Sequence, residues 1–324
     1  MIPLEEWIRA SATLKGSKEV AVSCHVSPDG DAFGSMLGLG LFLEGLGKKV
    51  YMSWGSAETV IPDNYAFLPG VDRIVAQDLI PDQVETFVAI DCGDLRRLDL
   101  LVPKFKAAGT RVNIDHHVSN TNYGDINLVD HTRASSAELA FELIQRMGGE
   151  VTPEMATALY TGLVTDTGRF QYSNTTPATL QAAVALREAG ADHLTVAEQI
   201  FESAPFEQLR ILGKVLNRAR LEDGVVYSWL YLDDLEGQGL EIAEDFIDFL
   251  KVVKEASVAV ILKERPEGGW RVSLRSRDDT DVSAVAQSFG GGGHTKAAGF
   301  SFGGDLEEAI KLVMERLAKA PSTT

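Results

Sequence analysis

Two hydrophobic patterns alternate along the first 190 residues of the chain. Short apolar runs typical of buried strands occur at residues 20–24, 49–52, 86–90 and 111–114. Between the first two runs, residues 35–44 carry apolar side chains at helical spacing and are followed by two glycines. A strand, a helix and a strand within about 35 residues form a βαβ unit, whose parallel sheet is covered on both faces. The pattern therefore predicts an α/β domain built on a parallel sheet.

The pattern after residue 130 predicts where the first domain ends and a second one begins. Residues 134–147 and 153–165 read as further helices of the first domain, the second opened by Thr152 as N-cap and by Pro153. The stretch 187–205 mixes helix-like and turn-like residues, and we place the inter-domain connection there. Beyond it we expect a helix at 206–220 and strands at 225–232, 257–263 and 270–277, the last two forming a hairpin. The prediction is a first domain at 1–186 and a smaller α/β domain at 206–324.

Composition narrows the classes of protein to which the chain can belong. It has 324 residues, with 30 Lys and Arg against 47 Asp and Glu, a net charge of −17. Long duplex DNA and anionic membranes both require a broad positive surface, so neither is an expected partner. No apolar run approaches the roughly 20 residues of a membrane span, the N-terminus does not resemble a signal peptide, and two cysteines make no disulfide framework. We expect a soluble cytoplasmic protein.

Carboxylates and imidazoles cluster where the predicted strands end. Singly, an Asp-Gly pair is usually a turn, and a lone histidine is usually hydrogen-bonded within the fold. Parallel strands, however, bring their carboxyl ends to one edge, where the unpaired carboxylates would repel one another unless divalent cations were bound. The residues are His25, Asp29, Asp31, Asp91, Asp94, Asp115, His116, His117 and, after the helix at 153–165, Asp166. Together they predict a metal centre.

The residue types indicate which metals fit. The set is rich in carboxylates, includes imidazoles and lacks thiolates, which favours Mn²⁺ or Mg²⁺ over structural zinc. Side-chain alternation turns Cys24 and Cys92 away from the neighbouring His25 and Asp91, so we expect both cysteines in the core. The ligands suffice for two ions, and a pair about 3.5–4 Å apart activates water for phosphoryl chemistry.

A glycine run near the C-terminus is the second candidate site. Residues 290–293 are four glycines, followed by His294 and Lys296. Such a run is often only a connector or a helix stop, but successive glycine N–H groups can also form an anion-binding nest. Alternation in the strand that precedes the run places cationic side chains, which bind phosphate, on one face. The residues on that face are Arg271, Ser273, Arg275 and Arg277. We therefore expect the second domain to bind phosphate groups.

These segments resemble the DHH phosphoesterase superfamily over nearly the whole chain. Within the superfamily, the compact length and the Gly-Gly-Gly-Gly-His sequence are most similar to the bacterial oligoribonuclease/pAp-phosphatase (nanoRNase) group. The matching segments are His25-x-x-Pro28-Asp29-Gly30-Asp31-Ala32-x-Gly34-Ser35, Asp91, Asp115-His116-His117, Asp166 within 165–168, and, for the DHH-associated domain, residues 290–299. Five motifs in the family's order make the resemblance specific, although the Asp-His-His triplet alone is weak.

The resemblance implies a role for each of these residues. One Mn²⁺ would be bound by His25, Asp29 and Asp91, and the other by Asp31, Asp91, His116 and Asp166. Three residues would act in catalysis. Asp91 would bridge the two ions, and Asp115 would orient the histidines. His117 would lie beside the phosphate and could assist the leaving group. The substrate phosphates would be bound by Arg275, Gly291, Gly292, Gly293 and His294, with Ser135 and Ser136 near the same cleft.

The implied activity is hydrolysis of short phosphoesters in a cleft between the DHH domain and the DHH-associated domain. Two Mn²⁺, with Mg²⁺ or Co²⁺ as alternatives, would activate a hydroxide that attacks phosphorus. Substrates would be short oligoribonucleotides, linear dinucleotides such as pGpG and pApA, and pAp, which would give AMP. A cyclic-di-AMP or other small-phosphoester phosphodiesterase, and a non-catalytic nucleotide sensor, stay open as alternatives. The sequence also leaves open whether the chain forms a homodimer.

Overall fold

The computed structural model describes residues 1–321 and divides the chain into two compact units, with the boundary between Ser203 and Ala204. The predicted connection at 187–205 contains a helix, α7 (His193–Phe201), and the unit boundary falls near its end. The assignment of this stretch as the connection between domains stays a prediction. Within residues 1–321, no helix is both long enough and apolar enough to cross a membrane.

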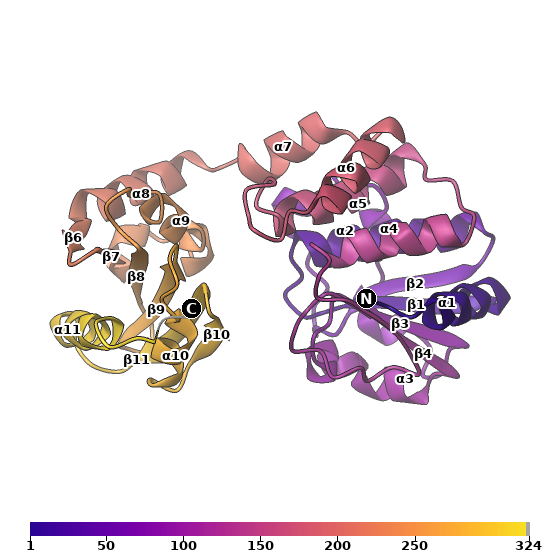
Figure 1. Ribbon diagram of the computed structural model, residues 1–324, viewed down its shortest axis with the longest axis horizontal. Helices are drawn as coiled ribbons and strands as arrows, with labels where there is room; N and C mark the ends of the chain where they lie inside the picture. The colour runs from indigo at the N-terminus through magenta and orange to yellow at the C-terminus, as the bar shows by residue number, and fades with distance from the viewer. Residues whose placement is uncertain (322–324) are drawn as a thin grey trace. The chain divides into compact units, whose positions relative to one another are not determined.

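A parallel sheet forms the centre of the first unit, as the apolar runs predict (Figure 1). Its strand order is β2-β1-β3-β4-β5, and each neighbouring pair is parallel. The chain therefore moves from β1 to β2 on one side and then to β3 on the other, which makes the β1–β3 boundary the topological switch point. The strands are β1 (Glu19–Cys24), β2 (Lys49–Trp54), β3 (Thr86–Ile90), β4 (Thr110–Asp115) and β5 (Ile126–Val129). The sequence patterns did not predict β5.

Both faces of this sheet are covered, which explains why its strands read as continuous apolar runs. On one face, alternate residues such as Val22 and Val88 pack against α1, α2, α4 and α5. On the other face, Ala21 and Phe87 pack against a 3₁₀ segment (Leu95–Leu101) and α3. The helices are α1 (Leu4–Gly16), α2 (Gly30–Gly45), α3 (Val102–Ala107), α4 (Ser136–Arg146), α5 (Pro153–Asp166) and α6 (Pro177–Glu188).

Helices α2 and α5 pack unusually closely, and the residues at their contact explain why. A Cβ at Gly34 of α2 would lie 2.4 Å from the carbonyl oxygen of Ala158 and 2.7 Å from the backbone nitrogen of Gly162. Helix backbones approach this closely only where a side chain is absent on one side. The contact places the first turn of α2 beside α5, with Gly30 against the side chain of Thr165 near its end. Both of these helix ends carry candidate ligands.

The second unit is a mixed sheet with strand order β10-β11-β9-β8-β7-β6. The predicted hairpin is present as β8 and β9, which pair antiparallel, whereas β7 and β8 are parallel. The strands are β6 (Arg220–Glu222), β7 (Val225–Leu230), β8 (Val258–Glu264), β9 (Trp270–Ser276), β10 (Gly292–His294) and β11 (Ala297–Phe302). The helices are α8 (Phe206–Arg218), α9 (Phe246–Leu250), α10 (Val282–Gln287) and α11 (Leu306–Leu317). A mixed α/β fold in each unit agrees with the predicted fold class.

Candidate active site

The carboxyl ends of β1, β3 and β4 lie side by side in the first sheet, because these strands are neighbours in its order. The loop after β1 carries His25, Asp91 follows β3, and Asp115 is the last residue of β4. Asp91 has a left-handed backbone conformation, with φ of 55°. Such a conformation is costly for a residue with a side chain and is often retained where it aims a functional group.

One group of predicted ligands is centred on His25 and Asp91. The Nε2 atom of His25 lies 3.5 Å from Asp91 Oδ2 and 3.7 Å from Asp29 Oδ2. Both His25 and Asp91 are almost fully buried, whereas the Asp29 side chain is 60% exposed. The other carboxylate oxygen of Asp29 caps α2 by accepting hydrogen bonds from two backbone N–H groups. Asp29 is therefore held by the helix while its second oxygen faces His25.

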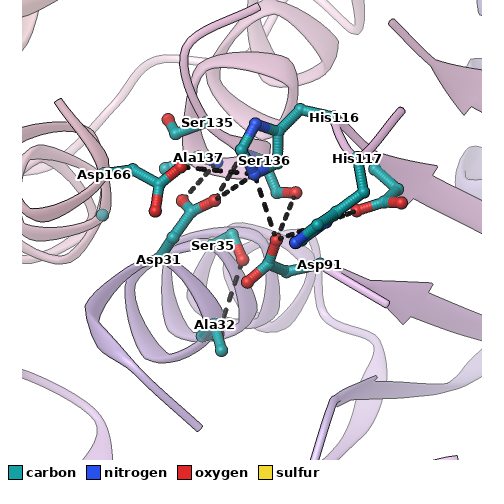
Figure 2. Close-up of polar contacts among 12 residues, drawn as sticks. Asp31, Ala32, Ser35, Asp91, His116, His117, Ser135, Ser136, Ala137 and Asp166 are labelled. Carbon is teal, nitrogen blue, oxygen red and sulfur yellow. Dashed lines mark hydrogen bonds and ion pairs between the residues drawn. The ribbon is translucent and has the colours of Figure 1, made fainter. Parts of the chain in front are cut away.

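A second group contains His116, Asp31 and Asp166 (Figure 2). His116 Nε2 lies 3.3 Å from Asp166 Oδ2, 3.8 Å from Asp31 Oδ2 and 3.6 Å from Asp91 Oδ1. The two oxygens of Asp91 thus face the two groups, one facing His25 and the other facing His116. The structure therefore brings together all six residues that the sequence analysis predicted as metal ligands.

The electrostatics of this cluster fit bound cations. Burial and the neighbouring carboxylates raise the pKa values of Asp31 and Asp166 well above those of ordinary aspartates. Burial also lowers the pKa of His116, which favours the neutral imidazole that metals require. For His25, burial is outweighed by the contacts with Asp29 and Asp91, which raise its pKa to about 10. Divalent cations would supply the positive charge that these crowded carboxylates need, and the oxygen and imidazole donors suit such ions.

The N-terminus of α4 donates hydrogen bonds to two carboxylates of this site. The backbone N–H groups of Ser136 and Ala137 donate to the two oxygens of Asp31, at 2.6 and 2.9 Å. The Ser136 hydroxyl donates to Asp91 Oδ1 at 3.0 Å (Figure 2). Ser135, which the resemblance places near the substrate, is fully buried, and its hydroxyl accepts from the Glu138 N–H as the helix cap. In this structure the contact with a functional carboxylate is made by the Ser136 side chain.

His117 is held by a chain of polar side chains behind the cluster. Its Nδ1 lies 2.7 Å from Asp115 Oδ1, and the Asn120 amide donates to the other oxygen of Asp115 at 2.6 Å. The hydrogen bond to buried Asp115 raises the pKa of His117, so the protonated imidazole is favoured. His117 Nδ1 also lies 3.7 Å from Asp91 Oδ1. His117 thus lies beside the cluster, and its Nδ1 atom is engaged in the hydrogen bond with Asp115.

At two residues the structure of the site differs from what the sequence pattern indicates. Arg97, which the sequence analysis missed, places Nη2 3.0 Å from His25 Nδ1, an atom that also lies 2.8 Å from the Val26 carbonyl oxygen. Asp94 does not join the cluster, because it pairs with Arg96 at 2.6 Å, and that contact lowers its pKa to about 2. An arginine six residues after a predicted ligand carries no spacing signal, so only the folded chain could identify Arg97.

The second unit has a hollow of about 660 Å³ over one face of β9. Arg271, Ser273 and Arg275 line it, as the strand alternation predicts. Arg277 does not, because β9 ends at Ser276 and the Arg277 guanidinium donates to the Val253 carbonyl at 2.9 Å. The placement of Arg277 on the cationic face therefore stays a prediction, although its side chain does not line the hollow.

The glycine run also lines the hollow, but it is not an open nest at its start. The N–H groups of Gly290 and Gly291 donate to carbonyls of α10, at 3.0 and 2.9 Å. Gly292, Gly293 and His294 form β10, which pairs with β11. A Cβ at Gly291 or Gly293 would lie about 2.5 Å or less from a β11 carbonyl oxygen. Close strand packing therefore explains two of the glycines, while Gly292 faces open space.

Comparison with known proteins shows which family has these features. The DHH family N-terminal domain matches residues 19–163, and the DHHA1 domain matches residues 223–319. A Thermus thermophilus protein named bifunctional oligoribonuclease and PAP phosphatase NrnA is 35% identical, over 91% of this chain and 88% of its own. The chain belongs to the DHH family. A Bacillus subtilis protein of the same name is 27% identical, over 91% of this chain and 93% of its own.

A solved structure shares the whole fold of this DHH protein. An exopolyphosphatase-related protein from Bacteroides fragilis superposes with a TM-score of 0.91 and 27% identity, covering 98% of this chain and 97% of its own. Membership of the DHH family makes the chain a hydrolase of phosphoester bonds. DHH enzymes depend on divalent metal ions, and the acidic and imidazole side chains of this chain are positioned to bind them.

Proposed function

We propose that the chain is a Mn²⁺-dependent phosphohydrolase that degrades short oligoribonucleotides and the linear dinucleotides pGpG and pApA to mononucleotides. The same activity would convert pAp to AMP. The observation that carries the proposal is the buried Asp91, whose two oxygens face the two groups of ligands. The substrate class is supported by the name of the Thermus thermophilus relative, which is similar over nine tenths of the chain.

The six ligand side chains divide between two cations in this proposal. His25, Asp29 and Asp91 would bind one ion, and Asp31, Asp91, His116 and Asp166 the other. When bound, the ions supply an activated water nucleophile and neutralise charge on the phosphate. The N-terminus of α4 orients Asp31, because backbone N–H groups donate to both of its oxygens, and these hydrogen bonds partly oppose the rise in its pKa that burial causes.

His117 would deliver the proton that the leaving oxygen needs. Its Nδ1–H donates to Asp115, so Nε2 is the nitrogen free to hold a proton toward the substrate. Asn120 fixes Asp115 from the other side, which sets the plane of the imidazole. The hydrogen bond to Asp115 raises the pKa of His117, which favours the protonated form that this role needs.

The second unit would bind phosphate groups of the substrate. Arg271 and Arg275 reach the hollow from the same strand face, and guanidinium groups bind phosphate through paired hydrogen bonds. Gly291, Gly292 and Gly293 line the hollow with backbone alone, so a phosphate can approach closely. His294 follows them at the exposed end of β10.

Metal and substrate tests can separate this proposal from its alternatives. The chelator-treated chain should release no mononucleotide from a 5′-labelled dinucleotide, and added Mn²⁺ should restore release and raise the melting temperature. Rates on pGpG and pAp should exceed rates on cyclic-di-AMP and pyrophosphate. Faster cleavage of either of the last two would favour another hydrolase of this family. Binding of pAp in Mn²⁺ without turnover would indicate a sensor.

Arg275 offers a test of the phosphate-binding role. Replacing Arg275 with alanine should raise KM for a dinucleotide about 10- to 100-fold, because one charged hydrogen-bond partner is lost, and should change kcat less. Arg277→Ala is the matched control, since Arg277 lies two residues away, does not line the hollow and donates its guanidinium to the Val253 carbonyl. Steady-state kinetics of both variants check the prediction, and equal KM values for the two variants would contradict it.

A further inference from the structure

A side chain outside the DHH motifs ties two parts of the metal centre together. The amide nitrogen of Asn174 donates to the Asp166 carbonyl and to the Ala134 carbonyl, each at 3.1 Å. Asp166 ends α5 and is a predicted ligand. Ala134 precedes the α4 N-terminus, whose N–H groups hold Asp31. Asn174 therefore joins the end of α5, which carries Asp166, to the start of α4, whose N–H groups hold Asp31 of α2.

The turn that carries Asn174 is built to bring the chain back to α5. Gly168, Arg169 and Phe170 have positive φ values of 54°, 61° and 63° in succession. A left-handed conformation is costly for arginine and phenylalanine, so the rest of the turn must hold it. The Thr167 hydroxyl donates to the Leu163 carbonyl at 2.7 Å and accepts from the Phe170 N–H at 3.1 Å. This fixed turn returns the chain to the carbonyl of Asp166.

The hydrogen bonding of the amide shows which of its atoms matter. Both partners are carbonyl oxygens, so the amide must present its nitrogen to them. Its oxygen is buried and accepts no hydrogen bond among residues 1–321. A buried acceptor without a partner is unfavourable, and a smaller or apolar residue would avoid that cost. The two donated bonds therefore outweigh the unpaired oxygen at this position.

A further contact shows how little room the two segments have. A Cβ at Gly162 of α5 would lie 2.7 Å from Asp31 Oδ1 and 2.7 Å from the Ala137 side chain of α4. A shift of α4 against α5 would therefore move Asp31 relative to Asp166. The Asn174 amide opposes such a shift, because it holds one carbonyl from each segment.

We propose that Asn174 is a positioning residue for the cation bound by Asp31, His116 and Asp166, and that it sets the spacing of Asp31 and Asp166. The inference rests on the proposed function, because it assumes that these three residues bind a cation. Loss of a partner that orients a metal ligand typically weakens metal binding 10- to 100-fold. We expect that loss for one ion only, since the Asn174 amide holds the backbones of Asp166 and Ala134, and neither bond involves His25 or Asp29 of the other ligand group.

Mn²⁺ titration of the chelator-treated full chain by calorimetry tests the proposal. Asn174→Asp keeps the shape but removes both N–H donors, and Asn174→Ala removes them without adding a charge. Each should bind one ion with the wild-type affinity and the other about 10- to 100-fold more weakly. Dinucleotide hydrolysis should fall at low Mn²⁺ and recover at high Mn²⁺, which a purely structural defect would not allow. Thr175→Val is the control, because the Thr175 hydroxyl is buried without a hydrogen bond.

Each outcome has a defined meaning. Wild-type affinity for both ions in the two Asn174 variants, or equal weakening of both ions, would overturn the positioning role. A lowered melting temperature with unchanged Mn²⁺ binding would show that Asn174 only stabilises the fold, and would also overturn it. A wild-type chain that binds Mn²⁺ at both sites but cleaves none of the nucleotides overturns the proposed function alone. A wild-type chain that binds no Mn²⁺ overturns both.

Discussion

Asp91→Asn should reduce Mn²⁺-dependent hydrolysis more than 100-fold, beyond the range expected for loss of a residue that only orients a ligand. The physical reason is that Asp91 faces His25 with one oxygen and His116 with the other, so one neutralised carboxylate affects both proposed cations. The left-handed backbone at this position makes asparagine the suitable replacement, because asparagine tolerates that conformation. Release of mononucleotides from a labelled dinucleotide measures the effect.

Asp94→Asn is the matched control for this experiment. Asp94 lies in the same loop and is also a carboxylate, but it pairs with Arg96 outside the ligand cluster. Asparagine can still accept the Arg96 N–H hydrogen bond that caps the following 3₁₀ segment. Hydrolysis by this variant should stay near the wild-type rate. Normal activity of Asp91→Asn would refute the assignment of Asp91 to both cations.

Gly34→Ala should destabilise the first unit by about 2–3 kcal/mol, because overpacking forces backbone to move. The added methyl group would meet the Ala158 carbonyl and the Gly162 nitrogen, and neither can rotate away as a side chain could. Helices α2 and α5 would have to separate, and this outweighs the gain of about 1 kcal/mol in helix propensity. For a unit of this size, calorimetry should show a melting temperature about 5–10 °C lower.

Gly45→Ala on the same helix is the control for the packing argument. Its Cβ would meet only the Met155 side chain, at 3.8 Å, which is ordinary contact. Stability should therefore stay unchanged or rise slightly, since alanine favours the helix. If both variants lose the same stability, the close approach of α2 and α5 is not the reason for glycine at position 34.

Local pattern predicted the framework of the site well. The runs at 20–24, 86–90 and 111–114 are strands, and Thr152 caps α5 as expected. Parallel neighbours place their ends together, so the convergence of His25, Asp91 and His116 could be predicted before any side chain was placed. Pattern failed at β5, which is short and lacks a continuous apolar run.

The supporting contacts of the site could not be predicted in the same way. Ser136 and Arg97 contact ligands far from them in sequence, and neither contact depends on a periodic spacing. Asn174 reaches Ala134 across 40 positions. The glycine run shows the opposite failure, because a local interpretation as a nest missed the strand pairing of β10 with β11. Contacts of this kind depend on how close two backbones come.

The sequence by itself determined the fold class, the edge of the sheet where the carboxylates meet and the family of the chain. These follow from apolar periodicity, from the residue types at strand ends and from the order of the motifs. Each of these signals can be read from short segments of the chain and from their order. The tertiary structure decided which hydroxyl contacts Asp91, that Arg277 is outside the hollow and that Asn174 joins α4 to α5. Those depend on distances between segments remote in sequence, where a fraction of an ångström separates a hydrogen bond from none.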